Sequence, residues 1–543
     1  MNPPGPVGPD DTVILDVQSM QSGWAVAGTT RAIGQAYTRN GCLLRAGDIA
    51  RRLDAICSTD AWIAEVAEYN GSFAAVGCRS GEVRAAVDRL RSLPLFYTLA
   101  GGTLRVADQA HALIASRPLS IDAQCRIEFQ HTGYVTGEET LVPGLRQIRA
   151  GHVLLREVGT HPRQVRYYAF RHHELLDESD DELTSRLVGV HRSVFRRLLD
   201  DLGERQIVIP LSGGYDSRLI GYSLRELGAR NVLCYTYGLP GNWESEISRE
   251  LARYLGFDWV MLPYSAEQWR TVAATPSFER YFMGAANFAA LAHIQDWPAV
   301  QALVTKKRIE RDAVFVPGHS GDFLAGSHVP KHFAHRQHIS RNELLQAMFN
   351  THYSLWDWPK SDATTMRRVF ASRIERVVGP IEDGTAEQAA DTFECWDCEE
   401  RQAKFIVNSV RAYESFGFQW RLPLFDAELM DFWSRIALRG RLRRRLYFEF
   451  VRRHQRLPIT EPNTDRGPLL ASGVRLLQAA GLRPLATEVR RRLRKGAWRH
   501  QYHHGDLGWF ALIEPDEFRK RYTGRENGHA FFVLRYLAAL ETQ

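Results

Sequence analysis

The feature that most constrains the fold is a glycine-rich turn between an apolar run and an amphipathic helical pattern, in IVIPLSGGYDSRLIGYSLRELG at residues 207–228. Adjacent glycines let the backbone approach a ligand closely, and the free N–H groups of the following helix favour an anion. Asp216 would repel a bare phosphate, so its presence indicates a Mg²⁺ ion shared with phosphate oxygens. The turn therefore predicts a phosphate site formed by Leu211, Ser212, Gly213, Gly214, Asp216 and Ser217. The alternative is a simple tight turn with Asp216 as a helix cap.

The segments around this turn alternate between strands and helices. Strand-like runs cover 206–211, 232–237, 259–263 and 313–317, which is typical of a parallel sheet wound with helices. Ligands in such sheets bind beyond the carboxyl ends of the strands. Two further strand ends carry suitable groups: Tyr237 and Gly238, and then Gly318, His319 and Asp322. We expect Asp216 and Asp322 to meet at this edge and bind the Mg²⁺ of a triphosphate.

The rest of the chain divides around this pattern. Residues 12–170 contain short β-type runs between glycine and proline turns, which predicts a largely antiparallel first domain. A polar, acidic stretch at 171–182 reads as a linker or helix start, and the second domain spans 180–543, mostly helical from about 335 onward. Residues 1–11 read as a flexible tail.

Composition and motifs argue against several classes of protein: nucleic-acid-binding, disulfide-rich, zinc-binding and membrane proteins. The formal charge of +6 is slight for 543 residues, and no nucleic-acid motif accompanies the basic stretch at 482–499, which is either a solvated helix face or a docking site for an acidic partner. Seven scattered cysteines predict no disulfide framework, and the lone C-x-x-C at Cys395 and Cys398 lacks a second pair for zinc. No run predicts a membrane span or signal peptide. We expect a soluble, cytoplasmic protein.

The motifs resemble those of the asparagine synthetase superfamily. SGGYDS resembles the pyrophosphate loop of ATP pyrophosphatases, and three later segments resemble that superfamily in the correct order: GNWESEISRELARYLG, PGHSGDFLAG and FGFQWRLPLFDAELMDF. In the first domain, NGSFAAV, DRLRSLPLFY and YVTGEETLVPGLRQIRAGH resemble the glutamine amidotransferase half. The resemblance implies a degenerate N-terminal-nucleophile-type β-rich sandwich (α+β, glutamine amidotransferase-like), followed by a Rossmann-like α/β ATP-pyrophosphatase domain with a helical C-terminal part.

The family's chemistry adenylates a carboxylate with ATP and Mg²⁺, after which an amine displaces AMP. In asparagine synthetases, an N-terminal cysteine releases the ammonia from glutamine. This sequence begins Met1-Asn2-Pro3-Pro4, and neither Cys42 nor Cys78 can replace a nucleophile that uses its own α-amine as base. We therefore expect no glutaminase activity and an amine supplied by the substrate itself. The resemblance is then strongest to the β-lactam, carbapenam and lasso peptide macrolactam synthetases.

Three positions depart from the family pattern. His319 stands where asparagine synthetases have Glu and β-lactam synthetases have Tyr; it is either a base for the attacking amine or a hydrogen-bonding residue of the loop. Arg466 stands where the family has a lysine that stabilises the reaction centre, and it keeps the charge with another geometry. Glu399 and Glu400 lie on a helix expected near the site, where one assists deprotonation or both pair at the surface with Arg401 or Lys404. We name His319, Arg466 and Glu400 as candidate catalytic residues.

The C-terminal third is rich in aromatic residues that either fill a core or form a wide apolar wall for a folded peptide: Trp356, Trp358, Trp396, Trp420, Tyr447, Phe448 and Phe450. We predict a lasso-type macrolactam synthetase that acts on a leader-free core peptide. The resemblance implies a leader peptidase and a leader-recognition protein as partners, and neither nucleic acid nor membrane. The alternatives are a small-molecule amide or β-lactam-like synthetase and a catalytically silent scaffold.

Overall fold

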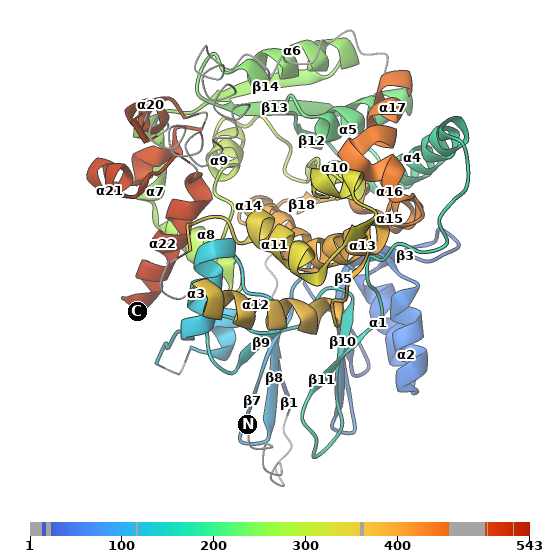
Figure 1. Cartoon of the computed structure of the whole chain (residues 1–543). Coiled ribbons are helices and arrows are strands. Elements are labelled where there is room, and N and C mark those ends of the chain that lie inside the picture. The colour runs from blue at the N-terminus through green and yellow to red at the C-terminus, as the bar shows by residue number, and fades with distance from the viewer. Residues whose placement is uncertain are drawn as a thin grey trace.

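The computed structural model describes residues 13–17, 23–115, 118–358, 363–454, 495–496, 498–505, 507–524 and 526–542. The strands of the first domain lie at one end of the molecule and the parallel sheet of the second domain at the other, with helices between them (Figure 1). The expected tail at 1–11 lies outside the described residues. None of the helices within those described ranges has the length and apolarity needed to cross a membrane.

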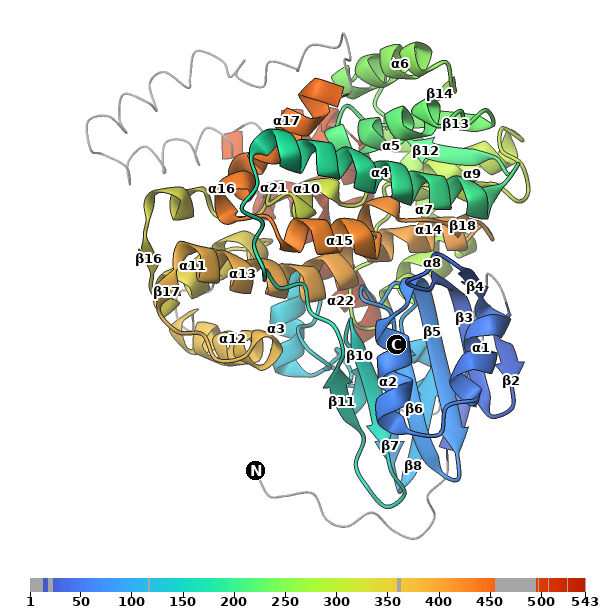
Figure 2. The ribbon, with the colours of Figure 1, turned by 90° about the vertical axis from the view of Figure 1, so that its right-hand side faces the viewer.

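The first domain contains two sheets (Figure 2). One has the order β11-β10-β6-β5-β3-β2 with β4 beside β3, and the other has the order β1-β8-β7-β9. The strands are β1 (Val13–Asp16), β2 (Ala25–Ala27), β3 (Thr30–Tyr37), β4 (Leu43–Arg45), β5 (Asn70–Arg79), β6 (Glu82–Val87), β7 (Phe96–Ala100), β8 (Thr103–Ala107), β9 (Leu145–Gln147), β10 (His152–Arg156) and β11 (Arg163–Arg166).

Alternation along the strands explains how these sheets are buried. Ala74 and Val76 of β5 share a hydrophobic cluster with Tyr97 and Val106 of the other sheet. Phe73, on the opposite face of β5, packs with residues of α1 (Ala46–Asp54) and α2 (Thr59–Ala67). A β-rich, mainly antiparallel first domain is therefore present, whereas its relation to glutamine amidotransferases stays a prediction.

The second domain contains a five-stranded parallel sheet, as the sequence predicts. Its order is β14-β13-β12-β15-β18, and every neighbouring pair is parallel. The strands are β12 (Ile207–Pro210), β13 (Val232–Gly238), β14 (Asp258–Pro263), β15 (Val314–Phe315) and β18 (Gln419–Trp420). The two-residue β18 was not predicted, because so short a run has no readable periodicity.

Both faces of this sheet are covered. Val208 of β12 belongs to one hydrophobic cluster, whereas Ile207 and Ile209 belong to another, as expected for a parallel sheet between helices. The helices that follow the first strands are α5 (Tyr215–Glu226) and α6 (Trp243–Leu255), and α4 (Asp180–Leu202) precedes them. Ser179 and Glu182 form a reciprocal capping box that fixes the start of α4 within the expected boundary region.

The remaining described chain is mostly helical. Its helices include α3 (Ala123–Thr132), α7 (Ala266–Ala273), α8 (Pro276–Ala286), α9 (Trp297–Thr305), α10 (Gly321–Leu324), α11 (Arg341–His352), α12 (Ala363–Val378), α13 (Ala386–Asp397), α14 (Arg411–Glu414), α15 (Ala427–Ser434), α16 (Leu438–Arg441), α17 (Arg445–His454), α20 (Trp498–His504), α21 (Pro515–Arg521) and α22 (Gly528–Glu541). A π-helix, η3 (Cys398–Ile406), and a 3₁₀ turn, η4 (Val407–Val410), join α13 to α14. The C-terminal helix α22 returns to the first domain, where Glu541 pairs with Arg126 of α3 at 2.9 Å.

The aromatic residues of the C-terminal third mostly fill cores. Trp396, Trp420, Tyr447 and Phe450 are each at most 5% exposed. Trp356 and Trp358 are partly buried against the same cluster as Trp396. The alternative of a wide apolar wall is therefore wrong for the four buried side chains, because packing between helices takes up their surfaces.

Candidate active site

The site lies where the strand order reverses. From β12 the chain proceeds to β13 and β14 on one side, and it then returns to place β15 on the other side of β12. The turns that follow β12 and β15 therefore lie side by side at the carboxyl ends of these two strands, the position at which open α/β sheets bind ligands.

The glycine turn leads into the uncapped start of α5. Gly214 is exposed and precedes α5 without a side-chain cap, so this end of the helix, with its positive dipole, suits an anion. The hydroxyl of Ser212 accepts a hydrogen bond from Gly214 N at 3.1 Å, and Ser217 Oγ accepts one from Ser212 N at 3.1 Å. Both serines thus shape the turn, and the reading of Asp216 as a simple helix cap is wrong because that cap is absent.

The turn after β15 packs directly against the glycine turn. Asp322 N donates to Asp216 Oδ2 at 3.0 Å. A Cβ on Gly318 would lie 2.8 Å from the backbone nitrogen of Ser217, so only glycine fits this approach. The two turns, 106 residues apart in sequence, therefore form one surface that carries both predicted Mg²⁺ ligands.

Two carboxylates in this environment favour a cation. Burial, followed by the charge of Asp322, raises the pKa of Asp216 to about 7. The Tyr447 hydroxyl donates to Asp216 Oδ1 at 2.6 Å and orients the carboxylate. Mg²⁺ typically binds through one or two carboxylates together with phosphates and water, so this pair fits a Mg²⁺–triphosphate. The described residues contain no group of three or more ligands that would hold a metal by themselves.

His319 follows Gly318 in the same turn, and its imidazole contacts a residue from another part of the chain. Its Nε2 lies 2.7 Å from Ser409 Oγ, in η4. Burial lowers the pKa of His319 to about 4, against the opposing charge of Asp322, so the ring is neutral near pH 7. A neutral imidazole can accept a proton, which the candidate role as a base requires.

The other predicted residues are placed as follows. Tyr237 and Gly238 end β13, next to β12, and Tyr237 stacks on Tyr264 with ring centroids 5.2 Å apart. Arg466 lies outside the described residues, as do Arg483, Arg490, Arg491, Arg492 and Arg494 of the basic stretch. Their roles stay predictions.

Glu400 forms its predicted pair with Lys404, but not at the surface. Both side chains are fully buried, and their charged atoms lie 2.7 Å apart. Glu400 also accepts hydrogen bonds from Gly137 N in the first domain, and Lys404 Nζ donates to the carbonyl of Gly137 at 2.6 Å. Glu399 pairs with Arg149 and Arg166 of the first domain. The surface pairing is thus wrong: these carboxylates hold the domain interface, and a role for Glu400 as a base remains a prediction.

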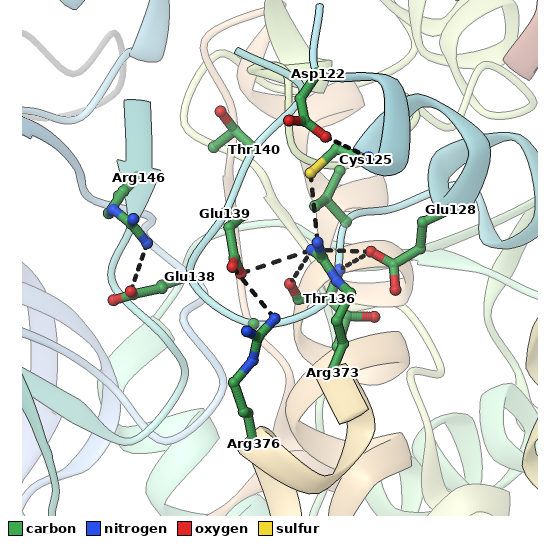
Figure 3. Close-up of polar contacts among 12 residues, drawn as sticks. Asp122, Cys125, Glu128, Thr136, Glu138, Glu139, Thr140, Arg146, Arg373 and Arg376 are labelled. Atoms are coloured by element: carbon green, nitrogen blue, oxygen red, sulfur yellow. Dashed lines mark hydrogen bonds and ion pairs between the residues drawn. The ribbon is translucent and has the colours of Figure 1, made fainter. Parts of the chain in front are cut away.

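Figure 3 shows a second part of this interface. Arg373 of α12 projects into the first domain, where it pairs with Glu128 at 3.0 Å and donates to the carbonyl of Thr136 at 2.9 Å. Arg376 of the same helix contacts Glu139 at 3.5 Å. The loop at residues 134–140 is therefore bound by two separate elements of the second domain, α12 and η3.

Sequence reasoning missed Tyr447 and Ser409. The sequence indicates Tyr447 only as a residue of a core or of an aromatic wall, and no pattern indicates Ser409. Each reaches the site from another helix, so no local motif could identify it.

Cys395 and Cys398 are both buried, and burial raises the pKa of each thiol, to about 12 for Cys395. These thiols are therefore poor metal ligands.

One region of the chain matches the model of a known protein family. Residues 190–454, just under half of the chain, match the family model of asparagine synthase. A comparison with curated proteins finds no match.

Similar solved structures share little sequence with this chain. An NH₃-dependent NAD synthetase from Campylobacter jejuni is 11% identical, with 37% of this chain and 89% of that chain covered and a TM-score of 0.19. A glutamine phosphoribosylpyrophosphate amidotransferase from B. subtilis is 10% identical, with 55% and 64% covered and a TM-score of 0.18. TM-scores this low carry no argument. The chain thus carries, over residues 190–454, a domain that matches the asparagine synthase family, and this domain contains Asp216, His319 and Asp322.

Proposed function

We propose that the protein is an ATP-dependent, AMP-forming amide ligase. The observation that carries this proposal is the meeting of Asp216 and Asp322 beside a glycine turn and the uncapped start of α5. A triphosphate accepts hydrogen bonds from such a turn, and Mg²⁺ held by the two carboxylates neutralises phosphate charge. The family match at residues 190–454 supports the same class of reaction.

The proposed reaction has two steps, adenylation of a carboxylate and attack by an amine. A substrate carboxylate oxygen attacks the α-phosphorus of ATP, and pyrophosphate leaves while the N–H groups of the glycine turn hold its oxygens. An amine then attacks the acyl carbon, AMP leaves, and His319 accepts the proton that the amine loses. Binding both reactants at one site makes the second step effectively unimolecular.

Within this class, we propose that the amine belongs to the same molecule as the carboxylate. Among the described residues of the first domain, Cys78 and Cys125 have thiol pKa values raised by burial, to about 12 for Cys125, whereas Cys42 and Cys57 are exposed. Arg79 donates to Cys57 Sγ at 2.9 Å and Arg373 to Cys125 Sγ at 3.6 Å. The backbone nitrogen of each of these four cysteines belongs to a peptide bond, however, so none can use its own α-amine as the base for glutamine cleavage. A peptide whose N-terminal amine attacks an adenylated Asp or Glu side chain satisfies this requirement and closes a macrolactam ring of the lasso type. A leader peptidase and a leader-recognition protein that supply the leader-free peptide belong to the same proposal.

The test is nucleotide analysis after incubation with ATP and Mg²⁺. A panel of synthetic peptides, each with a free N-terminus and one internal Asp or Glu, should yield AMP and pyrophosphate together with peptide lacking one water. Acetylation of the N-terminus should prevent ring closure. AMP formed only with small amino acids would replace the macrolactam proposal with a small-molecule ligase. If the protein neither binds ATP nor forms AMP with any substrate, the ligase proposal is overturned.

A further inference from the structure

Ser409 makes two short polar contacts with a single hydroxyl. Its Oγ lies 2.7 Å from His319 Nε2 and 2.8 Å from the carbonyl oxygen of Ile406, three residues earlier. A carbonyl oxygen only accepts hydrogen bonds, so Ser409 must donate its one proton there to satisfy that contact. The lone pairs of Oγ then remain for His319, and the imidazole must be the donor.

This assignment of protons determines the form of the imidazole. A neutral histidine carries one N–H, and the hydrogen bond made by one ring nitrogen decides which nitrogen keeps the lone pair. With the proton on Nε2, the basic atom is Nδ1. Nδ1 forms no hydrogen bond with any residue in the described part of the chain, so its lone pair is not used within the fold there.

We propose that Ser409 is a positioning residue that fixes His319 as the Nε2–H tautomer, so that Nδ1 is the atom that accepts the proton of the attacking amine. The proposal rests on the ligase function and goes one step further, because it assigns the acceptor atom and the residue that selects it. In the transfer, the amine nitrogen loses a proton to the Nδ1 lone pair as the C–N bond forms and AMP leaves.

The surroundings suit this role. His319 is neutral near pH 7 because burial lowers its pKa to about 4. The charged and titratable groups that act electrostatically on it are Asp322, on its own turn, and His293, in the segment after α8. A triphosphate bound at the neighbouring glycine turn would add negative charge near His319 and raise its pKa.

The helix that carries Ser409 is also held firmly. Ser409 is 2% exposed, with the buried Val407 and Val410 beside it. In the preceding element, η3, Lys404 donates hydrogen bonds to the carbonyls of Val135 and Gly137 in the first domain. Ser409 therefore cannot turn away from His319 without disturbing packed neighbours, which a positioning residue requires.

The direct test is the tautomer itself. The protein contains 19 histidines, so selectively ¹⁵N-labelled imidazoles are observed by NMR at pH 7.5, and the signals missing in His319→Gln identify His319. In the wild type, Nε2 should be protonated and Nδ1 unprotonated. Ser409→Ala should give a mixture of tautomers, and Ser409→Thr, which keeps the hydroxyl, should restore the wild-type pattern. This measurement requires neither substrate nor activity, so its result is independent of the ligase proposal.

A matched control separates the tautomer from local structure. Ser415 Oγ donates to the carbonyl of Ala412, also three residues earlier and at 2.8 Å, but no contact to a histidine is seen there. Ser415→Ala should leave the His319 signals unchanged. A wild-type His319 protonated on Nδ1, or one whose tautomer is unaffected by Ser409→Ala, would overturn the proposal.

The kinetic arm uses the peptide that forms AMP and product most rapidly in the panel. Ser409→Ala should lower kcat by about tenfold with KM for the peptide unchanged, which is part of the roughly 10²–10⁴-fold that a general base contributes. The acid limb of the kcat–pH profile should shift, because the pKa of His319 changes with its hydrogen bond. Equal loss in Ser409→Thr and Ser409→Ala, with no shift in the profile, would indicate a packing role only and reject the positioning role.

Discussion

The carboxylates of the strand-end site and those of the domain interface have opposite kinds of neighbours. At the interface, Glu400 lies 2.7 Å from Lys404, and Glu128 lies 3.0 Å from Arg373. At the strand ends, Asp216 and Asp322 meet each other and form no ion pair with any cation among the described residues. Paired charges stabilise a fold, whereas like charges brought together persist where a ligand will compensate them. The difference distinguishes the candidate active site from the surrounding structure.

Removal of the cation at the interface should have the largest effect. Lys404→Met leaves Glu400 as an unpaired buried carboxylate, which should lower the free energy of unfolding by about 3–5 kcal/mol. Urea unfolding followed by circular dichroism measures the loss. The double variant Glu400→Gln/Lys404→Met should recover much of it, because no buried charge remains.

The pH dependence of this variant has a definite sign. Burial already raises the pKa of Glu400 in the wild type, and loss of Lys404 should raise it further. The folded variant then binds a proton that the unfolded chain releases, so its stability should fall as pH rises through neutrality. A deficit that is larger at pH 5.5 than at pH 8 would contradict the pairing. A Glu400→Gln variant that is stable yet inactive would instead support Glu400 as a base.

A change in the strand-end pair, Asp216 and Asp322, should lower activity rather than stability. Asp216→Asn should lower AMP formation by about 10²–10³-fold, since one of the two Mg²⁺ ligands is lost. Its thermal stability should be unchanged or slightly higher, because repulsion from Asp322 is relieved. Asp258→Asn is the matched control, since Asp258 starts β14 at the opposite edge of the same sheet. A marked loss of stability in Asp216→Asn, with activity retained, would mean that the pair serves the fold.

The same contrast explains what could be predicted from sequence. The glycine turn, its following helix and the strand that precedes Asp322 are local patterns, so the parallel sheet and the meeting of Asp216 with Asp322 followed from them. Tyr447 and Ser409 could not be found, because each reaches the site from a distant helix. The sequence offers Lys404 or Arg401 as a surface partner for Glu399 and Glu400. The burial of Glu400 and Lys404 depends on the first-domain loop at 134–140, which no local pattern places against η3.

A smaller effect should follow from closing the space between the two turns. Gly318→Ala places a Cβ 2.8 Å from the Ser217 backbone nitrogen, and the backbone must move because that neighbour cannot rotate away. Overpacking of this kind costs about 1–3 kcal/mol, and we expect most of it to appear as weaker ATP binding, about tenfold. Isothermal titration with a non-hydrolysable ATP analogue measures the affinity. Gly144→Ala, which meets no atom within 4 Å but has φ +77°, should alter stability only. Unchanged nucleotide affinity in Gly318→Ala would show that the contact between the turns does not shape the phosphate site.

The smallest effect is expected for an ion pair that is neither buried nor at the site. Arg52 of α1 lies 3.3 Å from Glu65 of α2, and the side chain of Arg52 is 49% exposed. Water solvates both charges before and after the contact forms, so Arg52→Ala should change the free energy of unfolding by less than about 0.5 kcal/mol. Urea unfolding under the conditions used for Lys404→Met allows a direct comparison of the two variants. If Arg52→Ala lowers the free energy of unfolding by several kcal/mol, ion pairs stabilise this fold whether or not they are buried. The contrast between the buried interface and the strand-end site would then be wrong.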